Sequence, residues 1–325
     1  MIETTSLLVV LGVALCASAY VTRKVINKSR HVGMMGKDMH KAGKPAVPEM
    51  GGIAIVAGFV GATLVGLILH AFFGFQIQIA EVMAALLTVC IVAIIGIFDD
   101  VFDMAQLTKT VLPLAASVPL VVMAISLGHN VISIPFVGSI DFGLIYPLLL
   151  IPVAVSVCSN LVNNLAGWNG AEAGMGLVMF ATLAIVAFSH GQTEMTLICV
   201  AMLGALIGFL PFNWYPARIF IGDVGTLSIG AALAAAVIIS DLKSAGAILT
   251  IPYVVDFFLK AANKFPKSFS ELGSDGKLHA PAGKTRGLGD LVLRITGGLT
   301  ERNLTLVLMG IEAVFAIVVL ALYLK

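Results

Sequence analysis

Long apolar runs separated by short polar stretches dominate the chain. A helix needs about 20 mostly apolar residues to cross the hydrocarbon core of a bilayer. Ten runs come close to this length, at residues 4–22, 50–72, 80–98, 110–127, 144–160, 171–190, 194–211, 223–240, 243–262 and 303–324. The pattern predicts an all-α polytopic membrane protein with about ten transmembrane helices, in which residues 1–325 form a single integral membrane domain.

The lysines and arginines are unevenly distributed between the loops. Seven lie in residues 23–49, eight lie in residues 260–302, and Lys109 and Arg218 lie in two short loops on the same side. Seventeen of the nineteen basic residues thus lie on one side of the membrane. This side is predicted to be cytoplasmic, because loops rich in lysine and arginine stay in the cytoplasm. An even number of spans then puts both termini outside. The predicted cytoplasmic loops are 23–49, 98–109, 160–171, 211–223 and 260–302.

The composition excludes several other classes of protein. Hydrophobic residues make up 59% of the chain and charged residues 11%, against about 25% charged residues in a soluble domain. Nineteen basic and eighteen acidic residues nearly cancel, so no nucleic-acid-binding surface is indicated. The cysteines lie inside apolar runs without metal or redox spacing and are interpreted as packing residues.

Residues capable of chemistry gather on the side predicted to be cytoplasmic. They are Asp38, Glu49, Asp99, Asp100, Asp103, Asn160, Asn163, Asn164, Asn169, Glu172 and Asp223. The outer loops contain little besides short turns and a hydrophobic, hairpin-like stretch at 128–143. This asymmetry predicts an active site at the cytoplasmic face of the membrane.

The first of three candidate motifs is IGIFDDVFD, residues 95–103. It places Asp99 and Asp100 side by side at the end of an apolar helix. Two adjacent carboxylates there are costly unless a cation compensates them. Paired acids also suit a divalent-metal site or a general base. On this pair alone, the alternative that both residues cap the next element or face water stays open.

The other two motifs are SNLVNNLAGWNGAEAG (159–174) and FIGDVGTLSIG (220–230). In the first, Asn160 and Asn163 share a helical face, and amides can bind a sugar, a phosphate or a uracil edge, or give an oxygen to Mg²⁺. In the second, Asp223 starts an apolar helix as either a cap or a hard metal ligand. Each motif is weak singly, but together on one membrane side they indicate a site.

With these motifs in this order, the chain resembles the polyprenyl-phosphate N-acetylhexosamine-1-phosphate transferases. This ten-span family includes bacterial phospho-MurNAc-pentapeptide translocases and archaeal and eukaryotic dolichyl-phosphate GlcNAc-1-phosphotransferases. The similarity runs from about Gly36 to Arg286 and includes KDMHKAGKPAVPEMGG (37–52). Ala166 and Asn169 stand where bacterial members usually have aspartates. The late motif HAPAGKTR (279–286) has one histidine, whereas the corresponding bacterial motif has several. Both differences favour the dolichyl branch. This departure leaves open which residues of that loop hold the sugar and diphosphate.

The resemblance implies an activity and its partners. GlcNAc-1-phosphate would pass from UDP-GlcNAc to dolichyl or another polyprenyl phosphate, giving GlcNAc-diphosphate-dolichol and UMP. This would be the first lipid-linked step of glycan assembly, for protein N-glycosylation. The implied cofactor is Mg²⁺, with Mn²⁺ as an alternative, and the implied location is the cell membrane with the active site facing the cytoplasm. Homodimers are suggested by the family alone.

The resemblance also assigns roles to residues. Asn163 and Asp223 would hold Mg²⁺, Asp99 and Asp100 would be catalytic, and Lys109 would hold the lipid phosphate. Whether Asp99 is a base or only orients the acceptor stays open. The other implied substrate contacts are Lys37, Asp38, Met39 and Glu49 on the uridine side, Ser159, Asn160, Asn163, Asn164 and Asn169 in the third motif loop, and Lys267 and His279 near the diphosphate or sugar.

Three alternatives are weighed against this interpretation. A cation-coupled transporter needs acids near the middle of spans, but Glu81, Asp256 and Glu312 lie near helix ends or singly. No role is assigned to Glu312, which is interpreted as a buried polar contact or part of a subunit interface. A noncatalytic scaffold leaves the grouped acids and amides unexplained. Within the enzyme class, a bacterial-type undecaprenyl-phosphate sugar-1-phosphate transferase for cell-wall or surface glycan is the main alternative.

Overall fold

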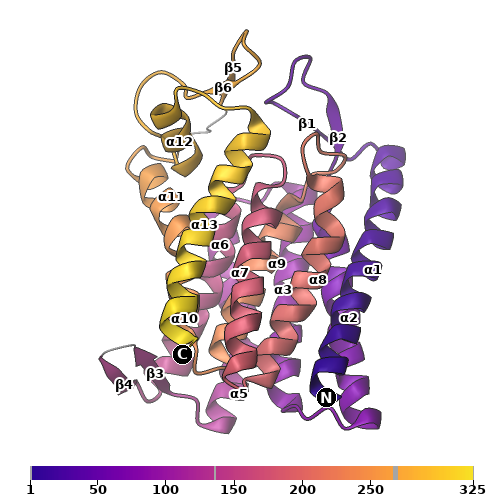
Figure 1. The fold of residues 1–325 in the computed structure, drawn as a ribbon, viewed down its shortest axis with the longest axis vertical. Coiled ribbons are helices and arrows are strands. Elements are labelled where there is room, and N and C mark those ends of the chain that lie inside the picture. The colour runs from indigo at the N-terminus through magenta and orange to yellow at the C-terminus, as the bar shows by residue number, and fades with distance from the viewer. Residues whose placement is uncertain (1, 135–136, 266–269, 325) are drawn as a thin grey trace.

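The computed structural model describes residues 2–134, 137–265 and 270–324, and it is a bundle of helices (Figure 1). The helices are α1 (Ile2–Val32), α2 (Gly52–Phe73), α3 (Ile79–Phe102), α4 (Gln106–Ala116), α5 (Val118–Leu127), the π-helical η1 (Tyr146–Leu150), α6 (Ile151–Leu165), α7 (Ala171–Ser189), α8 (Thr193–Asn213), α9 (Gly222–Ile238), α10 (Lys243–Leu249), α11 (Ile251–Ala261), α12 (Leu288–Thr296) and α13 (Glu301–Tyr323). The strands form three antiparallel pairs: β1 (Met35–Lys37) with β2 (Ala46–Pro48), β3 (Val131–Ile134) with β4 (Gly138–Asp141), and β5 (Glu271–Leu272) with β6 (Leu278–His279).

The helices account for the predicted membrane spans. Within the described residues, eight helical segments are long and apolar enough to cross a membrane, and α10 with α11 forms a further span that is bent by 50°. The shorter apolar helix α9, with 17 residues, coincides with the eighth predicted span. The predicted all-α polytopic membrane fold is therefore confirmed. The hairpin-like stretch at 128–143 forms the β3–β4 hairpin.

Helix α9 occupies the interior of the bundle. Fourteen of its 17 residues are buried, and it packs against α2, α3, α6 and α8. A helix that is apolar all round belongs in such an interior, where its neighbours shield its backbone and side chains. Its first turn carries Asp223, so the most enclosed helix of the bundle also supplies a predicted metal ligand.

The two ends of the bundle differ in what they carry. Both chain termini and the β3–β4 hairpin lie at one end, and the strands β1, β2, β5 and β6 with α12 lie at the other (Figure 1). The basic segments 23–49 and 260–302 therefore lie at the same end of the bundle, opposite both termini, as the distribution of basic residues predicts. We term this the loop end of the bundle.

The first helix is longer than the predicted span 4–22. It continues to Val32, so that the first basic residues lie on a helical extension rather than in a loop. After Gly12, no glycine or proline occurs in the chain before Gly33, which has a φ of +79° and ends the helix. In α13, Glu312 is 0% exposed, which rules out the interpretation that it lies on a subunit interface.

Candidate active site

Four charged residues from three helices meet at the loop end of the bundle. Asp99 and Asp100 lie in the last turn of α3, Lys109 in the first turn of α4, and Asp223 in the first turn of α9. The Nζ atom of Lys109 lies 2.5 Å from Oδ2 of Asp99 and 3.1 Å from Oδ2 of Asp223. We term these four residues the acid centre. Residues of two separate motifs are thus brought together with Lys109.

Asp99 and Asp100 make different contacts in the acid centre. Oδ1 of Asp100 accepts a hydrogen bond from the backbone N of Asp223 at 2.7 Å, and its Oδ2 accepts one from the N of Val224 at 3.1 Å. Such first-turn amides have no partner within their own helix, and a carboxylate there complements the helix dipole. Asp100 therefore caps α9 and fixes the backbone of Asp223. Oδ1 of Asp99 instead accepts from the N of Met104, at 2.9 Å.

Two glycines allow α3 and α9 to approach closely enough to build the acid centre. A Cβ atom on Gly96 would lie 2.4 Å from the Cα atom of Val224, so any side chain at this position would separate the helices. Gly222 has a φ of +70°, and a Cβ atom there would lie 2.6 Å from Oδ2 of Asp100. Both positions lie within or beside the sequence motifs that carry the aspartates.

Asn163 adds an amide oxygen beside the acid centre. Its Oδ1 atom accepts a hydrogen bond from Oγ1 of Thr226 at 3.1 Å, one helical turn after Asp223. Amide and carboxylate oxygens are the ligands that Mg²⁺ takes from proteins. Three carboxylates face only one ammonium in the acid centre, so negative charge is left for a cation to neutralise. The residues present therefore fit a divalent metal.

Two predicted substrate contacts lie behind the acid centre instead. Nδ2 of Asn160 donates to the carbonyl O of Lys109 at 3.3 Å, and Oγ of Ser156 donates to the carbonyl O of Thr110 at 2.6 Å. These bonds tie α6 to α4 and so hold the backbone that carries Lys109. Ser159 is 0% exposed and packs in the interface between α6 and α9.

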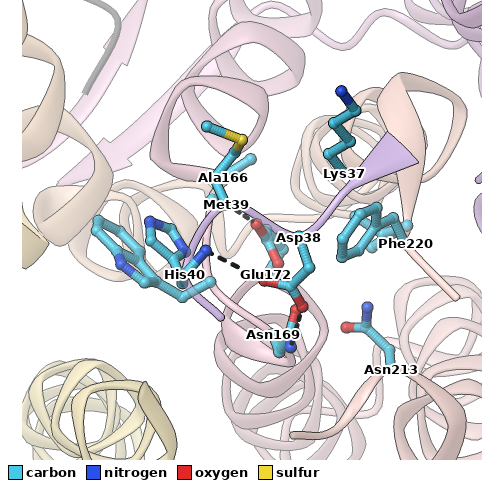
Figure 2. Close-up of a pocket in the computed structure, with 12 residues that line it drawn as sticks. Lys37, Asp38, Met39, His40, Ala166, Asn169, Glu172, Asn213 and Phe220 are labelled. Carbon is cyan, nitrogen blue, oxygen red and sulfur yellow. Dashed lines mark hydrogen bonds between the residues drawn. The ribbon is translucent and has the colours of Figure 1, made fainter. Parts of the chain in front are cut away.

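A pocket of about 210 Å³ adjoins the acid centre (Figure 2). The segment 220–223 belongs to both, because Phe220 and Ile221 line the pocket and Asp223 follows two residues after Ile221. The pocket residue Ala166 likewise follows Asn163 by three residues. The pocket is lined by Lys37, Asp38, Met39, His40, Ala166, Gly167, Trp168, Asn169, Glu172, Asn213, Phe220 and Ile221. Four of the predicted substrate contacts, Lys37, Asp38, Met39 and Asn169, are therefore in one place.

Backbone pairing positions the aromatic wall of the pocket. The N atoms of Gly51 and Gly52 donate to the carbonyl O atoms of Phe220 and Ile221 at 2.8 and 2.7 Å, and the N of Phe220 donates to the O of Pro48 at 2.8 Å. The end of the first loop and the start of the FIGDVG motif thus run together like two strands. This pairing fixes Phe220 in the pocket wall, three residues before Asp223.

A ring of polar contacts forms the buried side of the pocket. Oδ2 of Asp38 accepts from Nδ2 of Asn169 at 3.1 Å and forms an ion pair with Lys41. Nζ of Lys41 also lies 3.3 Å from Oε2 of Glu301, whose Oε1 accepts from the backbone N of Asn169 at 2.8 Å. We term these four residues the pocket network. Figure 2 shows Asp38 and Asn169 facing each other in it.

His40 lies against the pocket network. Its Nδ1 atom is 3.9 Å from Oε1 of Glu301, and its ring stacks on Trp168 with centroids 6.3 Å apart. Burial lowers the pKa of His40 to about 4; nearby Asp38 opposes this shift and Lys41 adds to it. Asp38, His40 and Glu301 offer ligand atoms within 4.8 Å of one another. However, the ammonium of Lys41 already contacts both carboxylates, so this cluster carries its own cation.

The turn between α6 and α7 is held from both of its flanks. Oε1 of Glu172 accepts from the backbone N of Gly167 at 2.7 Å. Nζ of Lys260, at the end of α11, donates to the carbonyl O of Asn164. The predicted substrate contact Asn164 thus contributes its backbone to the support of the turn.

Two other predicted contacts, Glu49 and His279, lie outside the pocket. Nε2 of His279 lies 3.1 Å from Oδ1 of Asp275 in the β5–β6 hairpin, and this hydrogen bond lowers the pKa of Asp275. Glu49 follows β2; burial raises the pKa of its carboxyl group, and its backbone O accepts from Oγ of Ser29 at 3.1 Å. Lys267 lies outside the described residues.

The sequence motifs do not single out several residues that the structure brings to the site. They are His40, Lys41, Trp168, Asn213, Phe220, Thr226 and Glu301. For Phe220 a signal existed, since this aromatic residue opens the motif that holds Asp223. Glu301 had no local signal, because 132 residues separate it from Asn169.

Comparison with protein families is consistent with this geometry. A model described as glycosyl transferase family 4 matches residues 82–241. The matched range contains the whole acid centre together with Asn163. It contains Asn169 and Phe220 of the pocket but neither Asp38 nor Glu301.

Individual relatives cover more of the chain. A protein of Saccharolobus solfataricus, provisionally named UDP-N-acetylglucosamine–dolichyl-phosphate N-acetylglucosaminephosphotransferase, is 39% identical over 308 residues, which are 94% of this chain and 93% of that one. A protein of that name in Dictyostelium discoideum is 27% identical, with 88% and 80% covered. A phospho-N-acetylmuramoyl-pentapeptide-transferase of Limosilactobacillus fermentum is 34% identical but aligns over 66% of each chain. The chain therefore belongs to glycosyl transferase family 4, and within it to the polyprenyl-phosphate N-acetylhexosamine-1-phosphate transferases that its motifs resemble.

Proposed function

We propose that the protein transfers GlcNAc-1-phosphate from UDP-GlcNAc to dolichyl phosphate or a related polyprenyl phosphate, giving GlcNAc-diphosphate-dolichol and UMP. The names of the Saccharolobus and Dictyostelium relatives support this reaction. The observation that carries it is that one segment, 220–223, serves both places: Phe220 and Ile221 line the pocket, and Asp223 belongs to the acid centre. A single donor can place its nucleoside in the pocket and its diphosphate beside Lys109 and Asp223.

The pocket suits the uridine part of the donor. Phe220 offers an aromatic face on which a base can stack. A carboxylate only accepts hydrogen bonds, so Asp38 turns the NH₂ group of Asn169 toward itself and leaves the amide oxygen as the acceptor. Uracil presents an N3–H donor that such an acceptor can bind, whereas cytosine presents a lone pair there. This orientation favours a uridine nucleotide over a cytidine nucleotide.

The acid centre suits a metal-bound diphosphate. Asn163 and Asp223 would hold Mg²⁺, or Mn²⁺ as the alternative, with Asp99 close by. When bound, the ion screens the negative charge of the diphosphate. Asp100 contributes by fixing the backbone of Asp223 through its two hydrogen bonds.

Lys109 compensates the negative charge of the lipid phosphate during the transfer. An oxygen of the lipid phosphate attacks the phosphorus that bears GlcNAc, a new P–O bond forms, and the bond to the α-phosphate breaks as UMP leaves. The acceptor is already an anion, so its approach to the donor requires compensating positive charge. Lys109 supplies this charge, and Asp99 holds its ammonium at 2.5 Å. The pairing supports an orienting role for Asp99.

The reaction would take place at the cytoplasmic face of the cell membrane. Most basic residues lie in the segments that meet at the loop end, where the acid centre also lies, and such segments stay in the cytoplasm. The acceptor is a membrane lipid and the donor is water-soluble, so the site belongs at the boundary between the two. We assign the enzyme to the first lipid-linked step of glycan assembly, for protein N-glycosylation.

UMP release by the purified, detergent-solubilised protein tests the proposal. We expect release from UDP-GlcNAc that requires both dolichyl phosphate and Mg²⁺. Release only with undecaprenyl phosphate and UDP-MurNAc-pentapeptide would replace the dolichyl assignment with the bacterial-type reaction. No release with any of these donors and acceptors from a folded protein would overturn the transferase proposal.

A further inference from the structure

Asn169, in the turn between α6 and α7, is held through its side chain and through both of its backbone polar groups. It is 5% exposed, and its side-chain Nδ2 donates to Asp38. Its backbone N donates to Glu301 and its backbone O accepts from Oγ1 of Thr305 at 3.0 Å. Two of these three contacts come from the first two turns of α13. The helix that ends the chain therefore determines where this pocket residue lies.

Glu301 is the residue through which α13 reaches the pocket. It is 4% exposed and opens the helix, where a carboxylate is favoured by the helix dipole. Each of its oxygens has a separate partner, Asn169 for Oε1 and Lys41 for Oε2. It is absent from the residues that line the pocket, so its effect on a ligand passes through these two partners and through His40, whose Nδ1 lies 3.9 Å from Oε1.

The pocket network is a closed ring. Starting from Asp38, hydrogen bonds or ion pairs lead to Asn169, then to Glu301, then to Lys41 and back to Asp38. The ring joins the loop between α1 and α2, the turn between α6 and α7, and α13, which are far apart in the chain. Charged hydrogen bonds in a buried setting are strong and mutually reinforcing. Removing one member therefore loosens the orientation of the other three.

We propose that Glu301, paired with Lys41, is a positioning residue for the nucleotide site that acts through Asn169. The inference rests on the proposed use of the pocket for uridine. Glu301 fixes the backbone of Asn169, and Lys41 holds Asp38 in the place from which it orients the Asn169 amide. The ring as a whole thus sets both the affinity for the nucleotide and the preference for uracil over cytosine.

Two substitutions at Glu301 separate its two contacts. Glu301→Ala removes both, and we expect the KM for UDP-GlcNAc to rise about tenfold, which corresponds to about 1.4 kcal/mol, with kcat changed less than about threefold. Glu301→Gln keeps an oxygen for the Asn169 backbone and loses the charge that pairs with Lys41. Its KM should rise less, by about threefold. Glu271→Gln, an exposed glutamate in β5, is the matched control and should leave both constants unchanged.

Base discrimination gives a second readout, which a loss of folded protein would not change. UMP and CMP are compared as inhibitors of the wild-type and variant enzymes, and the ratio of their inhibition constants is measured. We expect Glu301→Ala to lower this preference for UMP about tenfold and Lys41→Met to lower it as well.

The outcomes separate the inference from the function on which it rests. A wild-type enzyme that does not use UDP-GlcNAc overturns the proposed function. An active wild type with a Glu301→Ala variant that has normal KM and normal UMP preference overturns the positioning role, whatever happens to kcat. If Glu301→Ala does not fold, Glu301→Gln and Lys41→Met decide, and unchanged UMP preference in both is the overturning result.

Discussion

The acid centre and the pocket network are built from the same kinds of residue but use them differently. In the pocket network, Asp38 and Glu301 are buried and all four of their carboxylate oxygens have protein partners. In the acid centre, the side chain of Asp223 is 27% exposed and Lys109 is the one ammonium for three carboxylates. The pocket network balances two carboxylates with buried partners, whereas the acid centre has more carboxylates than ammonium groups and a partly exposed Asp223, so it can hold a metal or a substrate. The comparison therefore assigns structure to one cluster and chemistry to the other.

Substituting one aspartate in each cluster is the strongest test of this comparison, because the two variants should lose different properties. Asp223→Ala removes a proposed metal ligand, and we expect kcat to fall by about a thousandfold or more. Asp38→Asn should instead raise the KM for UDP-GlcNAc about tenfold, with no change in the Mg²⁺ concentration that gives half-maximal rate. UMP release measured across a Mg²⁺ titration distinguishes the two.

The control for this pair is Asp141→Asn, an exposed position in β4 at the opposite end of the bundle, which should behave as wild type. Near-normal, Mg²⁺-dependent turnover by Asp223→Ala would show that the metal assignment is wrong. A changed Mg²⁺ requirement in Asp38→Asn would show that the two clusters are not separate.

A smaller effect is expected from moving the helices that form the acid centre. Gly96→Ala places a methyl group 2.4 Å from the Cα of Val224, so α3 and α9 must separate by part of that overlap. We expect kcat to fall about 10-fold to 100-fold, because displacements of this size at a catalytic site are costly. Nucleotide binding in the pocket should weaken less, which titration with UMP can measure.

Gly61→Ala is the matched control, since a Cβ atom at this helical position meets nothing within 4 Å. Alanine is the better helix former, so this variant should be at least as stable as wild type. Equal activity of the two glycine variants would mean that the close approach at Gly96 is unimportant.

The smallest expected effect is on stability as the pH falls. Buried His40 has a pKa of about 4 in the folded protein against about 6.5 when unfolded, so the unfolded chain binds more protons between these values. The stability contributed by neutral His40 is full above pH 6.5 and is lost as the pH falls toward 4, by about 2 kcal/mol at pH 5. The thermal midpoint of the detergent-solubilised protein should therefore fall less between pH 7.5 and pH 5 in His40→Gln than in wild type.

The exposed His31→Gln provides the reference, and its midpoint should follow that of the wild type. If the thermal midpoint fell equally with pH in wild type and in His40→Gln, the prediction that His40 is neutral in the folded protein would be wrong.

Much of the fold could be predicted because membrane insertion imposes a simple rule on the sequence. Every predicted span coincides with a helix, and the basic segments meet at one end. The interior position of α9 was harder to predict from the sequence. Its 17 residues are mostly apolar, as are those of a lipid-facing helix. The bend between α10 and α11 was also not predicted, although Pro252 lies in the first turn of α11.

The candidate site was predictable where its residues lie in motifs. Asp99, Asp100, Asn163 and Asp223 stand out as polar residues at the ends of apolar helices, where a charge needs a reason. The structure brings these together with Lys109. The capping role of Asp100 depends on the close packing of two helices, and the ring around Glu301 depends on contacts across more than 130 residues. Neither leaves a local pattern in the sequence.

The segment between Lys260 and Glu301 is anchored at both ends, and this determines where an insertion would leave the pocket undisturbed. Lys260 and Glu301 bracket the stretch that contains the β5–β6 hairpin, and each holds the same turn between α6 and α7. The hairpin tip, residues 274–277, is exposed and lies away from both anchors. An insertion at this tip would extend the segment outward without moving Asn164 or Asn169. New recognition elements for other sugars or partner proteins can thus be added here while the nucleotide site stays intact.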